Sequence, residues 1–120
     1  RIVNNRKSEW VIERIRERAL IFERETGRKP AIACMGLAFK ADIDDLRESP
    51  ALYITKRLIS ENHEVIAVEP HITEHSGLEL RGIRDAVDMS DIIVFLVGHK
   101  EFRGLHPRGK AVLDFCGVTG

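Results

Sequence analysis

Short apolar runs alternate with amphipathic segments along residues 31–115, and this alternation points to one fold class. The apolar runs have the length and residue types of buried β-strands; they are residues 31–36, 64–68, 92–97 and 110–115. Between the first two runs, residues 50–61 have an apolar inward side, as a helix would. Strands separated by helical connections form parallel sheets with right-handed crossovers. The sequence therefore predicts an α/β fold built on a doubly wound parallel sheet.

The run 92–97 consists almost entirely of β-branched and aromatic residues. This composition indicates burial on both faces and therefore a central place in the sheet. A short helix over 83–89 and a helical turn over 100–105 are expected to supply further connections.

A long helix is predicted over residues 8–26, because Ile12, Ile15, Ala19 and Phe22 recur at helical spacing. Ser8 is expected to cap its start and Gly27 its end. Its apolar side is widened by four more residues, Trp10, Val11, Leu20 and Ile21. We expect this surface to pack on a second copy or on a part of the protein outside this sequence; the alternative is a helix lying wholly on its own sheet.

The 120 residues suffice for one domain, and 19 basic residues balance 19 acidic ones. We therefore expect no binding to nucleic acid and none to a membrane. The apolar runs are too short to cross a bilayer, so we expect a cytoplasmic protein. Because the chain begins at Arg1, we expect a piece of a longer protein, with residues 1–27 belonging to a linking helix and 28–120 forming a domain.

The connection 37–48 is about twice the usual length for a strand-to-helix loop. It leads into Ser49-Pro50, a cap residue followed by the residue favoured at a first helical position. The connection holds Lys40 and Arg47 among carboxylates, which are Asp42, Asp44, Asp45 and Glu48. Either this is a solvated rim, or the carboxylates hold the two cations toward an anionic ligand at the carboxyl edge of the sheet.

A dinucleotide fingerprint is incomplete here, because Gly36 is the only glycine of the expected three. Glu69 stands where a ribose partner would, but the match is weak. His99 follows a central strand, where it could make a polar contact near a ligand. His71 and His75 are expected to face solvent, so we predict no metal site. Two further residues, Cys34 and Cys116, are expected to be buried reduced thiols rather than a disulfide or catalytic groups.

Residues 33–50 resemble the signature G-x-A-F-K…D-D-x-R-E-S-P, which opens the C-terminal domain of nucleotide-sugar 6-dehydrogenases, the UDP-glucose/GDP-mannose dehydrogenase family. Other segments are similar to that family too, namely 3–5 with 10–12, 68–70, 96–99 with Phe102, and 112–114. The resemblance covers nearly the whole chain. It implies a Rossmann-like domain preceded by part of a long central helix through which two copies form a homodimer.

The resemblance also implies roles for single residues. Phe39 and Lys40 would contribute to a UDP-sugar site, and Arg47 would reach an NAD molecule bound mainly by another domain. Family members oxidise a primary alcohol twice with NAD and use a Cys that belongs before Arg1, so we expect no catalytic residue in this chain and no activity from it alone. Relatives often carry an Arg after the last strand, and residues 115–120 contain none.

Within the family, residues 43–50 and 5–10 are most similar to members that act on UDP-N-acetyl-D-mannosamine. The implied role is the oxidation of this sugar to its uronate for polysaccharide biosynthesis. UDP-glucose, UDP-N-acetylglucosamine and a non-catalytic nucleotide-binding regulatory module remain as alternatives.

Overall fold

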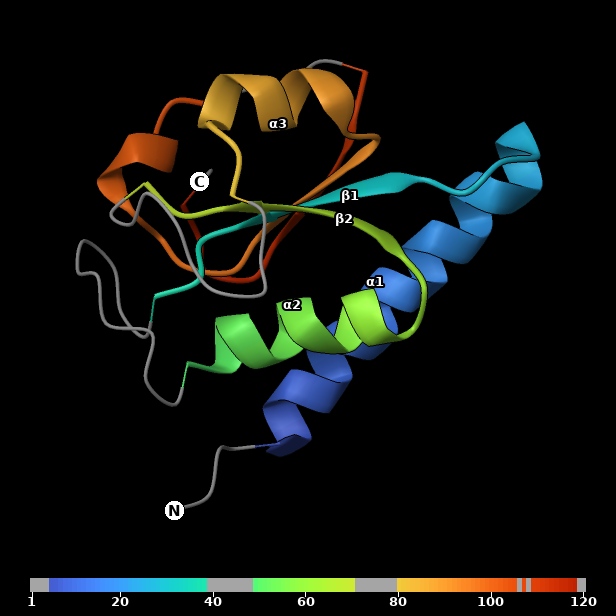
Figure 1. Ribbon diagram of the computed structural model, residues 1–120, viewed down its shortest axis with the longest axis horizontal. Coiled ribbons are helices and arrows are strands. Elements are labelled where there is room, and N and C mark those ends of the chain that lie inside the picture. The colour runs from blue at the N-terminus through green and yellow to red at the C-terminus, as the bar shows by residue number, and fades with distance from the viewer. Residues whose placement is uncertain (1–4, 39–48, 71–79, 106, 108, 119–120) are drawn as a thin grey trace.

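The structure is a computed structural model, and it describes residues 5–38, 49–70, 80–105, 107 and 109–118. The elements follow one another in the order α1 (Asn5–Thr26), β1 (Ala31–Met35), α2 (Pro50–Ser60), β2 (Glu64–Val68), α3 (Ile83–Met89), β3 (Ile92–Phe95), the 3-10 helix η1 (Lys100–Phe102) and β4 (Ala111–Asp114). Figure 1 shows α1 and α2 together on one side of the sheet and α3 on the other.

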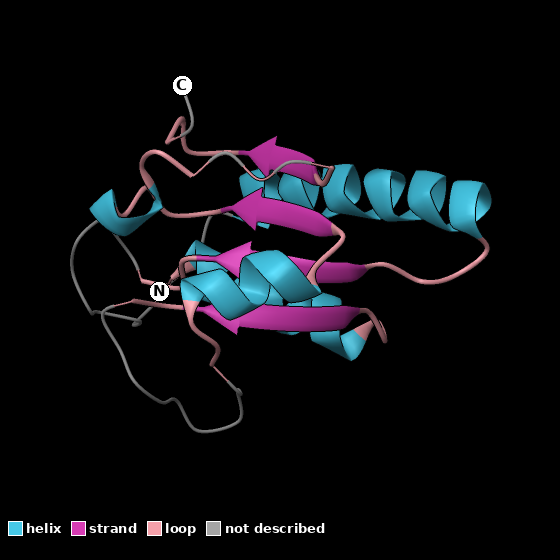
Figure 2. Cartoon of the chain, turned by 90° about the horizontal axis from the view of Figure 1, so that it is seen from above, coloured by secondary structure: helices cyan, strands magenta, loops and turns pink. Residues whose placement is uncertain are grey.

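The strands form one parallel sheet in the order β2-β1-β3-β4. Their arrowheads all point to the same edge in Figure 2, which we call the carboxyl edge. α2, which comes between β1 and β2 in the chain, lies on one face, and α3, which comes between β2 and β3, lies on the other. The predicted doubly wound parallel sheet is thereby confirmed, and so is the central place of β3, whose residues are all buried.

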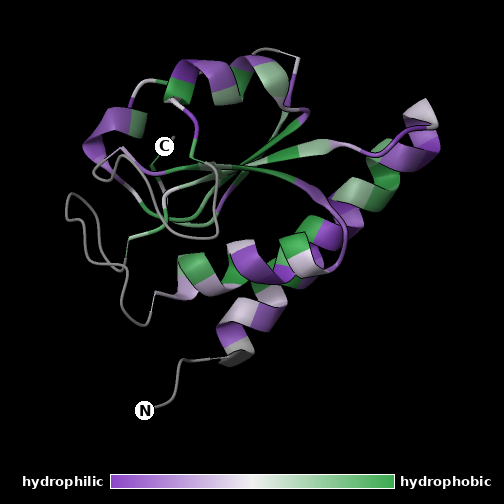
Figure 3. Cartoon of the chain, viewed as in Figure 1, coloured by the Kyte–Doolittle hydropathy of each residue, from purple (hydrophilic) through white to green (hydrophobic). Residues whose placement is uncertain are grey.

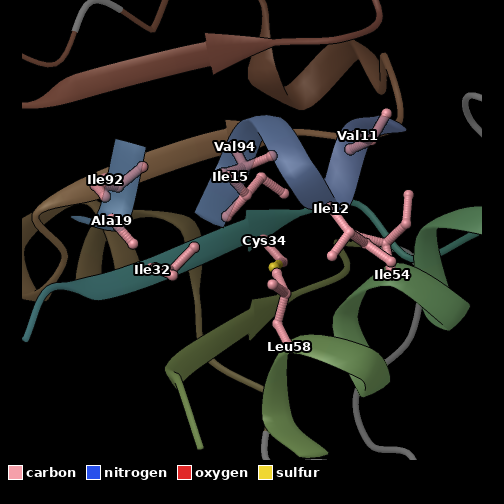
Figure 4. Close-up of a cluster of buried hydrophobic side chains, with 10 residues drawn as sticks. All are labelled: Val11, Ile12, Ile15, Ala19, Ile32, Cys34, Ile54, Leu58, Ile92 and Val94. Atoms are coloured by element: carbon pink, nitrogen blue, oxygen red, sulfur yellow. The ribbon is translucent and has the colours of Figure 1, made fainter. Parts of the chain in front are cut away.

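Alternate residues of β1 serve two hydrophobic cores, one on each face of the sheet. Ile32 and Cys34 point toward α1 and α2, where Figure 4 shows them with Ile12, Ile15 and Leu58. Ala31, Ala33 and Met35 pack on the face covered by α3 and η1. The strands are accordingly apolar along their length, while the helices carry polar residues on their outer sides (Figure 3). Burial of β1 on both faces is what makes its sequence a continuous apolar run.

The predicted boundaries agree with the structure for β2 and α3, and the predicted strands 92–97 and 110–115 are longer than β3 and β4. The helix α1 begins at Asn5, so the prediction that Ser8 caps its start is wrong. Ser8 lies inside the helix with only 2% of its surface exposed. Residues 5–7 are polar and give no periodic apolar signal, so this extra turn could not be predicted from the sequence. Gly27 follows the helix with a φ of 79°, as an αL residue ending a helix does.

Part of the wide apolar side of α1 is not covered. Val11 is buried, whereas Trp10, Leu20 and Ile21 are 53%, 48% and 40% exposed. Trp10 meets Phe115 edge to face, with ring centroids 5.8 Å apart. Within the described part of the chain, no helix combines the length and the apolar character needed to cross a bilayer.

Candidate functional site

The ends of β1 and β3 approach each other closely at the carboxyl edge. These neighbouring strands mark the point where the strand order reverses, and open α/β sheets bind ligands at such points. Gly36 follows β1 with a φ of 100°, and its amide donates to the Val68 carbonyl at 2.8 Å. A Cβ at this position would lie 2.7 Å from the Cβ of Val97. Glycine is therefore required here for the backbone geometry and for the close contact.

The dipeptide Leu37-Ala38 comes next and is held by side chains on both sides. Its two amide groups donate to one oxygen, Oε1 of Glu69, at 2.8 and 2.9 Å. Ser49 Oγ lies 2.6 Å from the Leu37 carbonyl oxygen and 3.3 Å from that of Ala38. Ser49 also accepts from the Leu52 amide at 3.1 Å, which confirms it as the cap of α2. The chain leaving β1 is thus tied to the end of β2 and to the start of α2.

His99 completes this cluster from the end of β3. Its Nε2 lies 2.9 Å from Oε1 of Glu69, and the exposed fractions of the two residues are 0% and 3%. The ring of Phe102 packs against the imidazole at a centroid distance of 5.6 Å. We call Leu37, Ala38, Ser49, Glu69 and His99 the edge cluster.

Two residues of the incomplete dinucleotide fingerprint, Gly36 and Glu69, have structural contacts at the end of β1. Glu69 is buried, and its Oε1 accepts the two backbone amides, so this residue has a structural role at the end of β1. Val97 occupies the position that a Cβ of Gly36 would take, so this glycine serves the close contact between the ends of β1 and β3.

A cavity of about 190 Å³ opens beside the edge cluster. It is lined by residues that follow β1, β3 and β4 and by the first turns of two helices: Lys7, Ser8, Val11, Ala38, Pro50, Ala51, Ile54, Leu96, Val97 and Phe115. Ligand pockets of proteins usually measure about 300–1,000 Å³. The described walls therefore enclose only part of the space that a nucleotide sugar needs.

The predicted site residues Phe39, Lys40 and Arg47 lie outside the described residues, as do the carboxylates around them and His71 and His75. The residues that flank them, Ala38 and Ser49, are both buried in the edge cluster. Sequence reasoning did not find that Glu69, His99 and Ser49 act together. Two features of the sequence could have indicated this cluster: Glu69 follows the apolar run of β2, and His99 follows that of β3.

The two cysteines are free thiols. Cys34 is buried as predicted, and its burial raises the pKa of the thiol to about 12. Cys116 is exposed, so the prediction of a buried residue is wrong: β4 ends at Asp114, two residues earlier than a strand containing Cys116 would. Desolvation of its sulfur raises the pKa of Cys116 to about 11. Both thiols are protonated at neutral pH and are poor nucleophiles.

Metal-binding clusters of three or more His, Cys, Asp or Glu side chains do not occur among the residues that the structure describes. The described residues at the carboxyl edge form a fixed backbone turn, a helix start and a partly apolar cavity.

The chain is similar to known proteins over nearly its whole length. Residues 33–119 match the family described as "UDP-glucose/GDP-mannose dehydrogenase family, UDP binding domain". The chain is 39% identical over 126 residues to the NDP-N-acetyl-D-galactosaminuronic acid dehydrogenase of Ralstonia solanacearum, covering 98% of the chain and 29% of that protein. It is 40% identical over 131 residues to the UDP-N-acetyl-D-mannosamine dehydrogenase of Yersinia pestis, covering 98% of the chain and 31% of that protein.

Among solved structures, the fold is similar to that of the UDP-N-acetyl-mannosamine dehydrogenase Cap5O from S. aureus, with a TM-score of 0.77 and 29% identity. The similarity covers 97% of this chain and 28% of that one. The chain thus spans less than a third of the length of these relatives.

Proposed function

The chain belongs to the UDP-glucose/GDP-mannose dehydrogenase family, and from that premise we propose that it binds the uridine diphosphate part of a nucleotide sugar at the carboxyl edge of its sheet. One observation carries the proposal: the family match over 33–119 includes the edge cluster and the walls of the cavity that follow β1, β3 and β4. The switch point of the sheet is also where ligands of this fold class bind.

We propose further that the chain is part of an NAD-dependent UDP-sugar 6-dehydrogenase. In that reaction, NAD would supply a hydride acceptor for each of two oxidations, from the alcohol to the aldehyde level and then, with an oxygen atom from water, to the acid. This chain's share is to bind and orient the nucleotide sugar. Phe39 and Lys40 are proposed to contact the UDP-sugar and Arg47 to contact NAD, on the strength of their place in the family signature. The two protonated thiols, Cys34 and Cys116, take no part in the chemistry, and the chain alone is expected to be inactive.

The proposed sugar is UDP-N-acetyl-D-mannosamine, and the product would serve polysaccharide biosynthesis. Relatives with 39% and 40% identity are named for substrates or products with an N-acetyl group, which favours such a sugar over glucose. UDP-glucose and UDP-N-acetylglucosamine remain alternative substrates.

The exposed apolar side of α1 supports a homodimer formed through this helix. Residues 1–27 would then belong to the linking helix and residues 28–120 to the UDP-binding domain. A cytoplasmic location is part of the same proposal, and the two unpaired cysteines agree with a reducing compartment.

Titration calorimetry of the chain with UDP tests the binding proposal. We expect weak binding of UDP, poor binding of NAD, and about tenfold weaker UDP binding in Lys40→Ala, because a charged hydrogen bond is worth about 1.5–3 kcal/mol. Lys56→Ala is the control, since Lys56 is an exposed lysine in the middle of α2. Absence of heat with UDP contradicts the proposal, and an unchanged affinity in Lys40→Ala removes Lys40 from the site.

The proposed oxidation is tested on the whole protein that contains this chain. Incubation with NAD and a panel of UDP-hexoses should produce NADH fastest with UDP-N-acetyl-D-mannosamine. UDP binding without NADH formation from any of the sugars would instead support a non-catalytic regulatory module.

A further inference from the structure

We propose that the buried pair Glu69–His99 is a positioning element, which sets the affinity for UDP by holding the backbone of Leu37-Ala38 at the carboxyl edge. The proposal rests on the proposed function. The pair itself does not contact the ligand. It lies behind Ala38, which forms part of the cavity wall.

The position of the pair in the sheet is the first argument. β1 lies between β2 and β3, and Met35 is in register with both Val68 and Phe95. Glu69 follows β2 directly, and His99 follows β3 after a short turn. The pair therefore bridges the two neighbours of β1 and meets the chain where it leaves that strand.

The second argument is that one oxygen receives three donors in a buried place. Oε1 of Glu69 lies 2.8 Å from the Leu37 amide nitrogen, 2.9 Å from that of Ala38 and 2.9 Å from Nε2 of His99. His99 donates this hydrogen bond in the tautomer that carries its hydrogen on Nε2. A buried N–H that loses its acceptor destabilises the folded protein, so the amides of Leu37 and Ala38 keep their hydrogen bonds to Glu69.

The third argument connects the pair to the cavity. Both carbonyl oxygens of Leu37-Ala38 face Ser49 Oγ, so the two peptide groups are fixed from opposite sides. Ala38 lines the cavity, and Phe39 and Lys40 follow it in the chain. Loosening Glu69 would let Ala38 move, and with it the cavity wall and the start of the segment proposed to bind UDP.

The test compares UDP affinity with stability in variants of the chain. His99→Leu removes the donor to Glu69 and is expected to weaken UDP binding about tenfold, which corresponds to about 1.4 kcal/mol. His99→Gln restores an N–H donor and is expected to recover most of the affinity. Glu69→Gln keeps an acceptor oxygen and should weaken binding less than His99→Leu, and the double variant Glu69→Gln/His99→Leu should be no weaker than His99→Leu alone.

Ser90→Ala is the matched control. Ser90 is as buried as His99 but lies just before β3, at the opposite edge of the sheet. This variant should lower the melting temperature without changing the affinity for UDP. A purely structural role of His99 predicts the same pattern for His99→Leu, and a folded His99→Leu that binds UDP like the wild type overturns the proposal. So does equal weakening in His99→Leu and His99→Gln.

A measurement on the wild-type chain does not depend on the folding of any variant. The Leu37 and Ala38 amides should be protected from hydrogen exchange as strongly as the amides of β1. Fast exchange at these two positions overturns the inference and leaves the proposed UDP binding standing. A wild-type chain that shows no UDP binding overturns both.

Discussion

Among the glycines that the structure describes, Gly36 has the least room for a side chain. It combines a positive φ with a Cβ position already occupied by Val97, and it directly precedes the edge cluster. A side chain at this position must push apart the ends of β1 and β3. Since these ends form the switch point, the proposed ligand site requires a residue without a Cβ at position 36.

Gly36→Ala is predicted to destabilise the chain much more than Gly27→Ala. Both glycines have a positive φ, which costs an L-residue about 1–2 kcal/mol, but a Cβ at Gly27 meets nothing within 4 Å. We expect a loss of about 1 kcal/mol for Gly27→Ala and more than about 2 kcal/mol for Gly36→Ala, measured by urea unfolding. Equal losses in the two variants would show that the contact with Val97 is easily relieved.

Between elements, α1 is joined to α2 by ion pairs as well as by apolar packing. Glu61 at the end of α2 accepts from Nε of Arg16 at 2.8 Å and from Arg57 at 3.1 Å. Arg57 and the Tyr53 hydroxyl both reach Glu9 on α1, at 2.6 and 2.8 Å. These side chains fix how α1 lies along α2, and α1 in turn supplies Ser8 and Val11 to the wall of the cavity.

The network makes stability depend on pH through Glu61. Hydrogen bonding from Arg16 lowers the pKa of Glu61 from 4.5 to about 2. A lowered pKa in the folded state stabilises the protein above the unfolded pKa, so this contribution is full above about pH 5 and is lost as the pH falls toward 2. Because Glu61 and Arg16 are 25% and 34% exposed, we expect only about 1 kcal/mol from the pair.

Glu61→Gln should therefore lower the free energy of unfolding by about 1 kcal/mol at pH 7 and reduce its decline between pH 5 and pH 2. Glu17→Gln is the control, because the ion pair of Glu17 with Arg14 lies within α1 and Glu17 is 54% exposed. Denaturant titrations at several pH values measure both. An acid decline as steep in Glu61→Gln as in the wild type would contradict the assignment.

Across the whole molecule, exposed apolar side chains gather where α1 passes the edge strand β4. Trp10 and Ile21 of α1 and Val112 of β4 line one shallow groove there. Charged side chains line the rest of the groove, namely Arg14, Glu17, Arg18 and Asp114. Exposed apolar side chains that gather beside polar ones mark an interaction site more often than scattered exposed residues do. The proposed homodimer would cover it.

Ile21→Lys is predicted to weaken self-association of the chain, because a charge would be buried at the interface. The control is Met89→Lys, which places a charge on an apolar side chain of α3 that is 52% exposed on the other face of the sheet. Sedimentation velocity over a range of concentrations should show a dimer for the wild type and Met89→Lys and a shift toward monomer for Ile21→Lys. A wild type that stays monomeric at every concentration rules out a dimer formed by this chain alone.

Local and periodic features of the molecule could be predicted from its sequence. The apolar runs predicted the strands, because residues buried on both faces leave no polar position, and Ser49-Pro50 predicted the start of α2, because a helix cap involves only neighbouring residues. The family signature likewise lies in one continuous stretch. Ser8 was misjudged because polar residues continue a helix without any periodic sign of it.

The edge cluster was decided by the tertiary structure alone. Glu69 lies 32 residues from Leu37 and 30 from His99, and they meet only because β2 and β3 flank β1 in matching register. Apolar periodicity states which residues are buried in a sheet but not which strands are neighbours. The sequence by itself thus determined the strands, the helices and the family, whereas strand order, a long-range property of packing, decided which polar side chains hold the end of β1.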